Sequence, residues 1–202
     1  DFYDRKALFV EAADRLLAAG YSRAGFESFA KPNDILSEAI ENSKATYNSL
    51  GTVTAEALNF VAVGSSAHGA LGDDYYFQNY YEHILYQEAL EKGEFPVYRG
   101  IKLSAEDKLR REVIKEIRTY FSVNFSLINS KHNINFRQHF EKELGIIKEF
   151  ERDLLVKIED DRLILTELGQ HFSPQVCSVF DIYLDRPLFN SAIATSAEGV
   201  AS

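Results

Sequence analysis

Apolar side chains recur at helical spacing in several parts of the chain. Two stripes with spacings of three and four run between residues 4 and 19 and precede Gly20, so this segment is expected to form an amphipathic helix that ends at the glycine. Another strong stripe follows Ser104, whose hydroxyl is a typical helix cap, and predicts a helix through residue 121. Further helices are expected around residues 125–131, 135–150 and 167–184.

The segments between these helices carry strand and turn signals. The aromatic-rich run 21–30 predicts a short strand, and Asp34 predicts the cap of a short helix. Residues 46–54 are expected to form a loop, whereas the apolar run 57–63 is expected to form a strand. Residues 154–166 alternate around a charged turn, which is the pattern of a two-stranded hairpin.

The order of these elements predicts an α/β protein with two parts. A helix followed directly by a strand is typical of α/β units, and this order opens the chain. From Ser104 onward, helices and one hairpin follow in an order that resembles a winged helix. We therefore expect an α/β unit (1–103), a mainly helical, winged-helix-like domain (104–184) and a flexible tail (185–202).

Composition indicates a folded globular chain. Of its 202 residues, 46% are hydrophobic and 26% are charged, and no apolar stretch approaches the length of a membrane-spanning helix. The formal charge of -9 disfavours binding to nucleic acids or to anionic membranes. Acidic residues also outnumber basic ones within 104–184. A non-enzymatic winged-helix interaction module, with the hairpin near 159–162 as its wing, is therefore the least favoured function.

The chemistry that the residues alone support is limited. The single cysteine, Cys177, fits a reducing, cytoplasmic setting and cannot supply the several thiolates of an iron–sulfur cluster. The five histidines lack the paired spacing of a zinc site. The sequence signatures of serine hydrolases, phosphate-binding loops and dinucleotide-binding folds are missing.

Two segments are candidates for contact with a ligand. Residues 64–69 place glycines and other small residues after an apolar run, a pattern that either lets a ligand approach the backbone or simply reverses the chain. The aromatic cluster between residues 75 and 86 either stacks on a flat cofactor or, more commonly, packs in a core or an interface. The residues alone leave both alternatives open.

Five segments resemble, in order, the oxygen-independent coproporphyrinogen III oxidases, which are radical S-adenosylmethionine enzymes. The longest runs from Phe95 to Ile114 and begins Phe-Pro-Val-Tyr-Arg-Gly-Ile-Lys-Leu-Ser. The other segments are 27–34, 64–79, 136–144 and 180–184, so that the likeness covers roughly residues 5–184. Because the chain starts at Asp1 and contains no methionine, we expect it to be the C-terminal piece of a longer protein.

The resemblance implies that residues 1–103 are the last part of a partial (β/α) barrel and that residues 104–184 form a cap that excludes water from the reaction. It implies a 4Fe-4S cluster, bound by the missing N-terminal part, that cleaves S-adenosylmethionine to a 5'-deoxyadenosyl radical. The radical takes hydrogen from propionate side chains of coproporphyrinogen III, and decarboxylation yields protoporphyrinogen IX in haem biosynthesis. We therefore expect a cytoplasmic, monomeric oxidoreductase with a tetrapyrrole substrate and no nucleic-acid or membrane partner, of which this fragment alone is inactive.

Site residues follow from the resemblance by position. The residues expected to bind S-adenosylmethionine are Glu27, Phe29, Ser66, Ala67 and His68. The last three are expected to wall the adenosine pocket, and the first two to lie at the mouth of the barrel, where its strands end. Arg99 is expected to bind a substrate carboxylate, because a guanidinium forms paired hydrogen bonds with carboxylates. We expect no catalytic residue and no metal ligand in this chain.

Two further arginines and one histidine leave alternatives open. Arg110 and Arg111 are substrate candidates as well, although helix-surface ion pairs with Glu106 or Asp107 are the commoner fate of such arginines. His68 stands where the oxidases typically carry an apolar residue, and Ser-Ala-His is similar to the corresponding stretch of the haem-chaperone relatives. A haem chaperone or a haem-utilisation methyltransferase on the same fold is therefore the alternative function.

Overall fold

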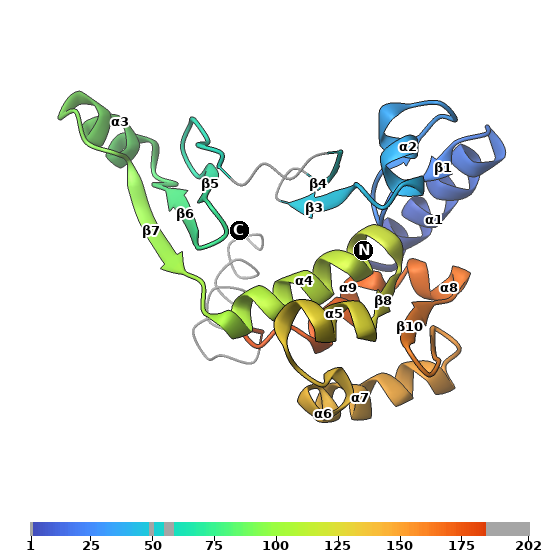
Figure 1. The fold of residues 1–202 in the computed structure, drawn as a ribbon. Coiled ribbons are helices and arrows are strands. Elements are labelled where there is room, and N and C mark those ends of the chain that lie inside the picture. The colour runs from blue at the N-terminus through green and yellow to red at the C-terminus, as the bar shows by residue number, and fades with distance from the viewer. Residues whose placement is uncertain (1, 49–50, 55–58, 185–202) are drawn as a thin grey trace.

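The computed structural model describes residues 2–48, 51–54 and 59–184. The architecture is mixed α/β, with a long central helix that joins a small sheet on one side to short strands and helices on the other (Figure 1). The expected tail, 185–202, and the beginning of the expected strand 57–63 lie outside the described residues. Among the described helices, none combines the length and the apolar character needed to cross a bilayer.

The first part of the chain contains short elements only, apart from its first helix. They are α1 (Phe2–Ala18), β1 (Ser22–Arg23), β2 (Phe29–Ala30), α2 (Ile35–Glu41), β3 (Thr46–Asn48), β4 (Gly51–Val53), β5 (His68–Leu71), β6 (Tyr75–Asn79), α3 (His83–Glu91) and β7 (Val97–Lys102). The helix before Gly20 is confirmed, and the glycine has a φ of 82°, which favours a residue without Cβ. The cap at Asp34 is also confirmed, because its carboxylate accepts a 2.8 Å hydrogen bond from the amide of Leu36.

Three predictions for this part are wrong. Residues 21–30 form two strands, β1 and β2, that pair antiparallel, because the chain turns at Gly25 with a φ of 82°. The segment 46–54, expected to be a loop, holds the antiparallel pair β3 and β4. The second strand, β4, begins at Gly51, which has a φ of 102°. Residues 59–63 form no strand, and Phe60 makes only an isolated bridge to Ala70. The described strands pair antiparallel throughout, whereas the strands of a (β/α) barrel are parallel. The partial (β/α) barrel therefore stays a prediction.

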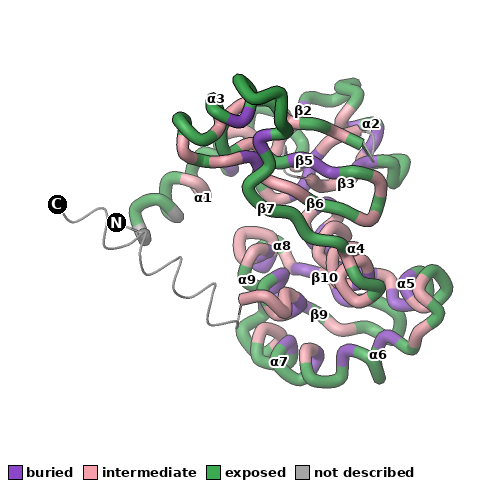
Figure 2. Tube along the Cα trace, turned by 90° about the vertical axis from the view of Figure 1, so that its left-hand side faces the viewer, coloured by how far each residue is buried: buried purple, intermediate pink, exposed green. Residues whose placement is uncertain are grey.

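The sheet that matters most for the site has the order β5-β6-β7. Its register places residues of the three strands directly opposite one another, and such residues share one face of a sheet. Two rows therefore lie on the same face: His68, Gln78 and Arg99 in the first, and Ala70, Tyr76 and Ile101 in the second. Strand β7 is exposed along its whole length (Figure 2).

The second part is mainly helical. Its elements are α4 (Ala105–Tyr120), β8 (Ser122–Asn124), α5 (Phe125–His132), α6 (Phe136–His139), α7 (Glu141–Arg152), β9 (Val156–Ile158), β10 (Arg162–Leu165), α8 (Glu167–Gln170) and α9 (Ser173–Val179). The expected hairpin is confirmed as β9 and β10, and β8 joins it in the order β8-β10-β9. The prediction of a single helix over 167–184 is wrong, because two short helices, α8 and α9, form instead. Pro174 stands in the first turn of α9, where its missing N–H is tolerated.

Helix α4 starts with the predicted cap and supplies much of the core. The hydroxyl of Ser104 accepts a hydrogen bond from the amide of Asp107, and the Asp107 carboxylate accepts one from the amide of Ser104. The core cluster lies entirely between residues 109 and 180. Its completely buried large side chains are Val113, Ile117, Val123, Phe136, Phe140, Ile147, Leu163, Val176 and Phe180.

Candidate functional site

Two adjoining cavities lie between the β5-β6-β7 sheet and helix α4. The Arg99 cavity, of about 500 Å³, is lined by the sheet, by the first half of α4 and by residues 180–183. The Tyr47 cavity, of about 400 Å³, is lined by the sheet, by α4 and by strand β3. Five residues line both: His68, Tyr76, Phe77, Arg111 and Ile114. We call the two cavities together the sheet–helix cleft.

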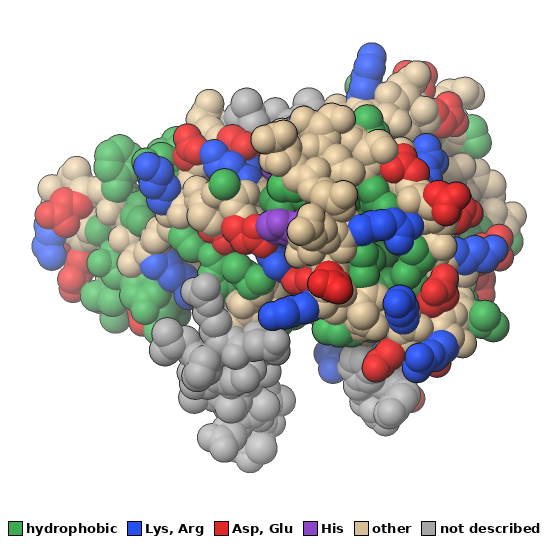
Figure 3. Space-filling view, turned by 60° about the horizontal axis from the view of Figure 1, so that its bottom comes forward, with side chains coloured by type: hydrophobic (Ala, Val, Ile, Leu, Met, Phe, Trp, Pro, Cys, Tyr) green, Lys and Arg blue, Asp and Glu red, His purple; other side chains and the backbone are tan. Residues whose placement is uncertain are grey.

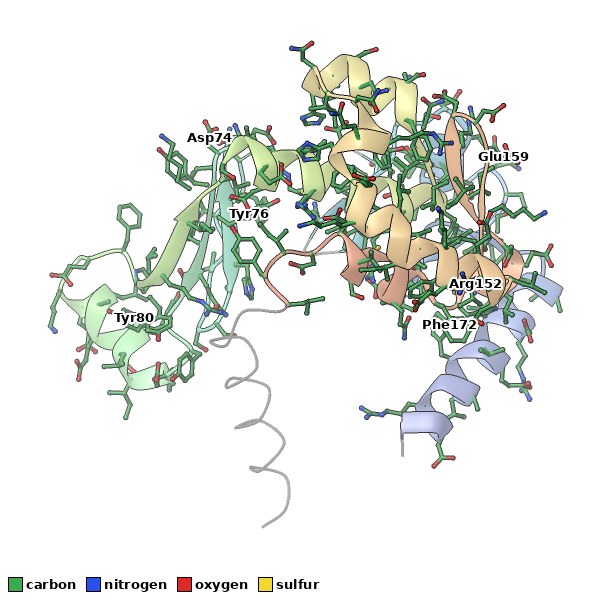
Figure 4. All side chains as sticks on the ribbon, turned by 90° about the horizontal axis from the view of Figure 1, so that it is seen from below. Asp74, Tyr76, Tyr80, Arg152, Glu159 and Phe172 are labelled. Atoms are coloured by element: carbon green, nitrogen blue, oxygen red, sulfur yellow. The ribbon has the colours of Figure 1, made fainter. Side chains whose placement is uncertain are left out.

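The floor of the cleft is the sheet face formed by the two rows described above. Tyr76 extends from β6 on the side of the sheet that helix α4 passes, and Asp74 lies where the sheet meets the start of that helix (Figure 4). The amine of Lys108 donates a hydrogen bond to Asp74, which fixes this end of the sheet to α4. This hydrogen bond is the main reason that the pKa of the Asp74 carboxyl is lowered. The sheet and helix α4 are thus linked directly next to the start of the helix.

His68 and Arg99 both line the Arg99 cavity. The Nε of Arg99 donates a 2.9 Å hydrogen bond to the side-chain oxygen of Gln78, the residue that lies between His68 and Arg99 in the row. Gln78 in turn donates to the carbonyl oxygen of Ser66 at 3.2 Å. Among the described residues, Arg99 forms no ion pair, so its charge is balanced by no carboxylate there.

The turn before β5 is fixed to the sheet by backbone bonds. Gly64 and Ser66 have φ angles of 111° and 61°, and the amide of Ser66 donates to the carbonyl of Tyr80 at 2.8 Å. The carbonyl of Ala67 accepts a 2.9 Å hydrogen bond from the amide of Asn79. Ser66 and Ala67 line neither cavity, whereas His68 lines both. The turn therefore acts by placing His68 at the point where the cavities meet.

Arg110 and Arg111 already have anionic partners. Arg110 pairs with Glu106 and, at 2.8 Å, with Glu143, so the predicted ion pair on the helix surface is confirmed. Arg111 pairs with Asp73 from the loop before β6. Burial opposes the charge of each arginine, but their hydrogen bonds outweigh it and raise both pKa values. Among the three arginines considered for a substrate carboxylate, Arg99 is the one without such a pair.

The two residues expected at the barrel mouth lie apart. Glu27 accepts a 2.9 Å hydrogen bond from the hydroxyl of Tyr47, which lines the Tyr47 cavity, so Glu27 is one contact away from the cleft. Phe29 lies under the guanidinium of Arg23, whose carbon is 5.4 Å from the ring centroid, and lines neither cavity. The structure thus gathers His68 and Arg99, links Glu27 to them through Tyr47, and leaves Phe29 outside.

The sequence predicts no site role for Tyr47, and it indicates Tyr76 and Gln78 only as members of the segments 75–86 and 64–79. Tyr76 and Gln78 stand two residues apart in a strand, so alternation within 75–79 was the signal for their shared face. Tyr75, Tyr76 and Tyr81 are exposed, which excludes a core position for these three rings and leaves an interface or a contact with a flat cofactor as their expected roles. Hydrophobic side chains gather at the end of the molecule formed by α3 and β7 (Figure 3).

The described residues also limit the metal chemistry. No group of three His, Cys, Asp or Glu side chains in the described ranges is placed to hold a metal ion. The thiol of Cys177 is buried in the core, and burial raises its pKa to about 12. A thiol of this kind stays protonated at neutral pH and is a poor ligand.

Comparison with known proteins shows which proteins this chain resembles. Residues 103–172 match the family described as HemN C-terminal domain. The oxygen-independent coproporphyrinogen III oxidase of Helicobacter pylori is 34% identical over 181 residues, which are 90% of this chain and 39% of the relative. The chain is a homologue of these oxidases. The enzyme of the same name from Pseudomonas aeruginosa is 31% identical over 88% of this chain and 38% of its own length.

A solved structure agrees with this coproporphyrinogen oxidase homology. The coproporphyrinogen III oxidase HemN from Escherichia coli, described as a radical S-adenosylmethionine enzyme, has a TM-score of 0.80 and 29% identity over 86% of this chain. The match covers 40% of the Escherichia coli chain, so this chain spans about two fifths of the length of these three relatives. The resemblance to the C-terminal part of these oxidases is therefore confirmed, and the α/β class with it.

Proposed function

We propose that this chain is the C-terminal part of an oxygen-independent coproporphyrinogen III oxidase and that the sheet–helix cleft forms one wall of its reaction cavity. The observation that carries the proposal is that His68 and Arg99, expected in the cofactor and substrate sites respectively, line one cavity. The names of the relatives from Helicobacter pylori and Pseudomonas aeruginosa supply the reaction.

The Tyr47 cavity fits the adenosine part of S-adenosylmethionine. Phe60, Ala70 and Phe77 supply apolar walls for a purine, while His68 and Asn48 supply polar groups at its edge. Together with the iron–sulfur cluster, S-adenosylmethionine supplies the radical chemistry of the reaction when both are bound. In this proposal His68 lines the adenosine pocket, the turn at Ser66 and Ala67 places His68 there, and Glu27 supports the pocket through Tyr47, whereas Phe29 lies outside it.

The iron–sulfur cluster does not fit this chain. A 4Fe-4S cluster needs several thiolates, and the chain has one cysteine, whose thiol is buried in the core. In the proposed enzyme the cluster ligands lie upstream of the homologous segment. This chain then contributes to binding and orienting the ligands, and to keeping water out.

The Arg99 cavity fits an amphipathic substrate that carries carboxylates. Ile101, Ile114 and Phe180 provide an apolar lining, and the guanidinium of Arg99 stands at the sheet side of the cavity without a carboxylate partner among the described residues. A tetrapyrrole with propionate side chains combines these two properties. Arg99 would then bind a propionate of the tetrapyrrole.

The domain arrangement is part of the proposal. In residues 1–103, the buried hydrophobic side chains of the described ranges are alanines, apart from Pro96, whereas Leu8, Ile35 and Val63 are exposed. Such surfaces are what a barrel fragment exposes when the strands and helices that cover it lie elsewhere in the polypeptide. Residues 104–184 hold the core and include the three-stranded antiparallel sheet of β8, β9 and β10, which supports a winged-helix-like cap. The cytoplasmic location and the monomeric state stay predictions.

The product formed by the full-length enzyme tests the proposal. Under anaerobic conditions, with coproporphyrinogen III, S-adenosylmethionine and a reductant, we expect protoporphyrinogen IX to form. The Arg99→Ala variant is expected to raise the KM for coproporphyrinogen by about tenfold, because one charge-assisted carboxylate contact is lost. Lys92→Ala, a change on the exposed end of α3, serves as the matched control. Tight haem binding without turnover would contradict the proposal and support the haem-chaperone alternative.

A further inference from the structure

Arg118, on helix α4, holds the ring of Tyr47 from behind the cleft. Its Nη2 donates a 2.5 Å hydrogen bond to the Tyr47 hydroxyl, and its guanidinium carbon lies 4.5 Å from the centroid of the Tyr47 ring. Tyr47 lines the Tyr47 cavity together with His68, whereas Arg118 lines neither cavity. Arg118 is therefore one contact away from this cavity, through Tyr47.

The contact is part of a small, partly buried network. The Tyr47 hydroxyl donates to Glu27 at 2.9 Å, and the same carboxylate oxygen lies 3.7 Å from Nη2 of Arg118. The guanidinium carbon also lies 5.0 Å from the ring centroid of Phe26, so the guanidinium contacts two aromatic rings. The Arg118 side chain is only 14% exposed, whereas that of Glu27 is 45% exposed, so solvent screens the ion pair with Glu27 more than the contact of Arg118 with the Tyr47 ring. A planar guanidinium can stack and donate at once, which an ammonium cannot do in the same way.

The tyrosine is in the protonation state that this network needs. Burial raises the pKa of the Tyr47 hydroxyl, and Glu27 adds to this effect while Arg118 opposes it. The hydroxyl therefore keeps its proton at neutral pH. It donates that proton to Glu27 and accepts from Arg118, so both of its hydrogen-bonding directions are used.

The backbone around Arg118 is fixed by the core of the second part. Ile117 and Thr119, its neighbours in α4, are buried at 0% and 2% exposure. The carbonyl of Arg118 accepts a 3.0 Å hydrogen bond from the amide of Phe26, and the hydroxyl of Tyr120 donates to the carbonyl of Ala45 at 2.7 Å. This end of α4 thus presents the guanidinium from a rigid element.

We propose that Arg118 is a positioning residue that fixes Tyr47 in the cavity wall and thereby sets the affinity of the cleft for an adenosine-containing ligand. The segment that matches the HemN C-terminal domain would in this way control a wall built by the preceding part of the chain. The identity of the ligand rests on the proposed function, whereas the restraint on Tyr47 does not.

The restraint is tested on the chain itself by fluorine NMR. With 3-fluorotyrosine in place of the 11 tyrosines, the resonance of Tyr47 is assigned by its loss in the Tyr47→Phe variant. Arg118→Leu is expected to shift and broaden this resonance, and Arg118→Lys to do so less. Arg15→Leu, which removes a 79% exposed arginine from α1, is the control and is expected to leave it unchanged. An unchanged Tyr47 resonance in Arg118→Leu would overturn the proposal.

The consequence for binding is tested with S-adenosylhomocysteine as the probe, in the full-length protein. We expect its dissociation constant to rise by about fivefold in Arg118→Leu and by a smaller factor in Arg118→Lys, with no change in Arg15→Leu. A shifted Tyr47 resonance with an unchanged dissociation constant would overturn the link to binding. If the unchanged protein does not bind the probe, the proposed function fails and the ligand part of this inference fails with it, while the NMR result still decides the restraint.

Discussion

Replacing Phe136 by alanine is expected to destabilise the second part of the chain by about 3–5 kcal/mol, because a fully buried aromatic ring leaves a cavity that its neighbours cannot fill. The ring stacks on Phe125 with centroids 4.3 Å apart and contacts Phe140 at 4.7 Å. It therefore lies at the centre of the aromatic core that holds α5, α6 and α9 together. Urea unfolding of the chain, followed by circular dichroism, measures the loss.

Phe95→Ala is the matched control for this prediction. Phe95 is 88% exposed, so its removal is expected to change the free energy of unfolding by less than about 0.5 kcal/mol. A loss below about 1 kcal/mol for Phe136→Ala would show that the ring does not hold the core as described. Phe136→Leu is expected to lie between the two, since it keeps an apolar side chain of similar volume.

Gly169→Ala is expected to destabilise the chain by at least about 3 kcal/mol, because a Cβ at this position meets backbone rather than a flexible side chain. The added atom would overlap the carbonyl oxygen of Leu155 and lie 2.7 Å from its carbonyl carbon. This carbonyl accepts a 3.0 Å hydrogen bond from the amide of Thr166, the cap of α8. Relief of the overlap would separate α8 from the start of the hairpin. Thermal unfolding is a sufficient readout.

Gly145→Ala provides a control with the opposite sign. Gly145 lies inside α7, and a Cβ there would meet no atom within 4 Å. Alanine is the better helix former, so this variant is expected to stabilise the chain by up to about 1 kcal/mol. If both variants changed the stability by the same amount, the close approach of Gly169 to Leu155 would be contradicted.

The helices of the second part were predictable because their signals are local. The cap at Ser104 and the apolar stripe of α4 lie within one stretch of sequence, and both are found where the pattern places them. The hairpin β9 and β10 likewise follows from alternation around a charged turn. In the last helix, Pro174 was visible in the sequence, and its effect on helix continuity was overlooked.

The short strands of the first part depend on contacts with a distant helix. Gly25 turns the chain so closely to α4 that an added Cβ would lie 2.8 Å from the carbonyl oxygen of Arg118. The amide of Phe26 donates to that same carbonyl. Strands of two or three residues carry too little periodicity to be recognised, and nothing local announces a partner so far along the chain.

Some residues of the candidate site could be predicted from the sequence, and others depend on contacts with distant parts of the chain. His68 and Arg99 came from the family resemblance, and strand register explains why both line one cavity, since each is paired with Gln78. Tyr47 was missed because its segment was expected to be a loop, and its role depends on a hydrogen bond from α4. Phe29 was assigned from a barrel arrangement, and its ring packs against Arg23 away from the cleft.

The affinity of the full-length enzyme for S-adenosylmethionine, measured by calorimetry for His68→Ala, tests the central claim that the sheet–helix cleft is the cofactor wall. His68 lines both cavities, so we expect the dissociation constant to rise by about tenfold. His83→Ala, at the exposed start of α3, is expected to leave it unchanged. Equal dissociation constants for the unchanged enzyme and His68→Ala would remove His68 from the site and contradict the account.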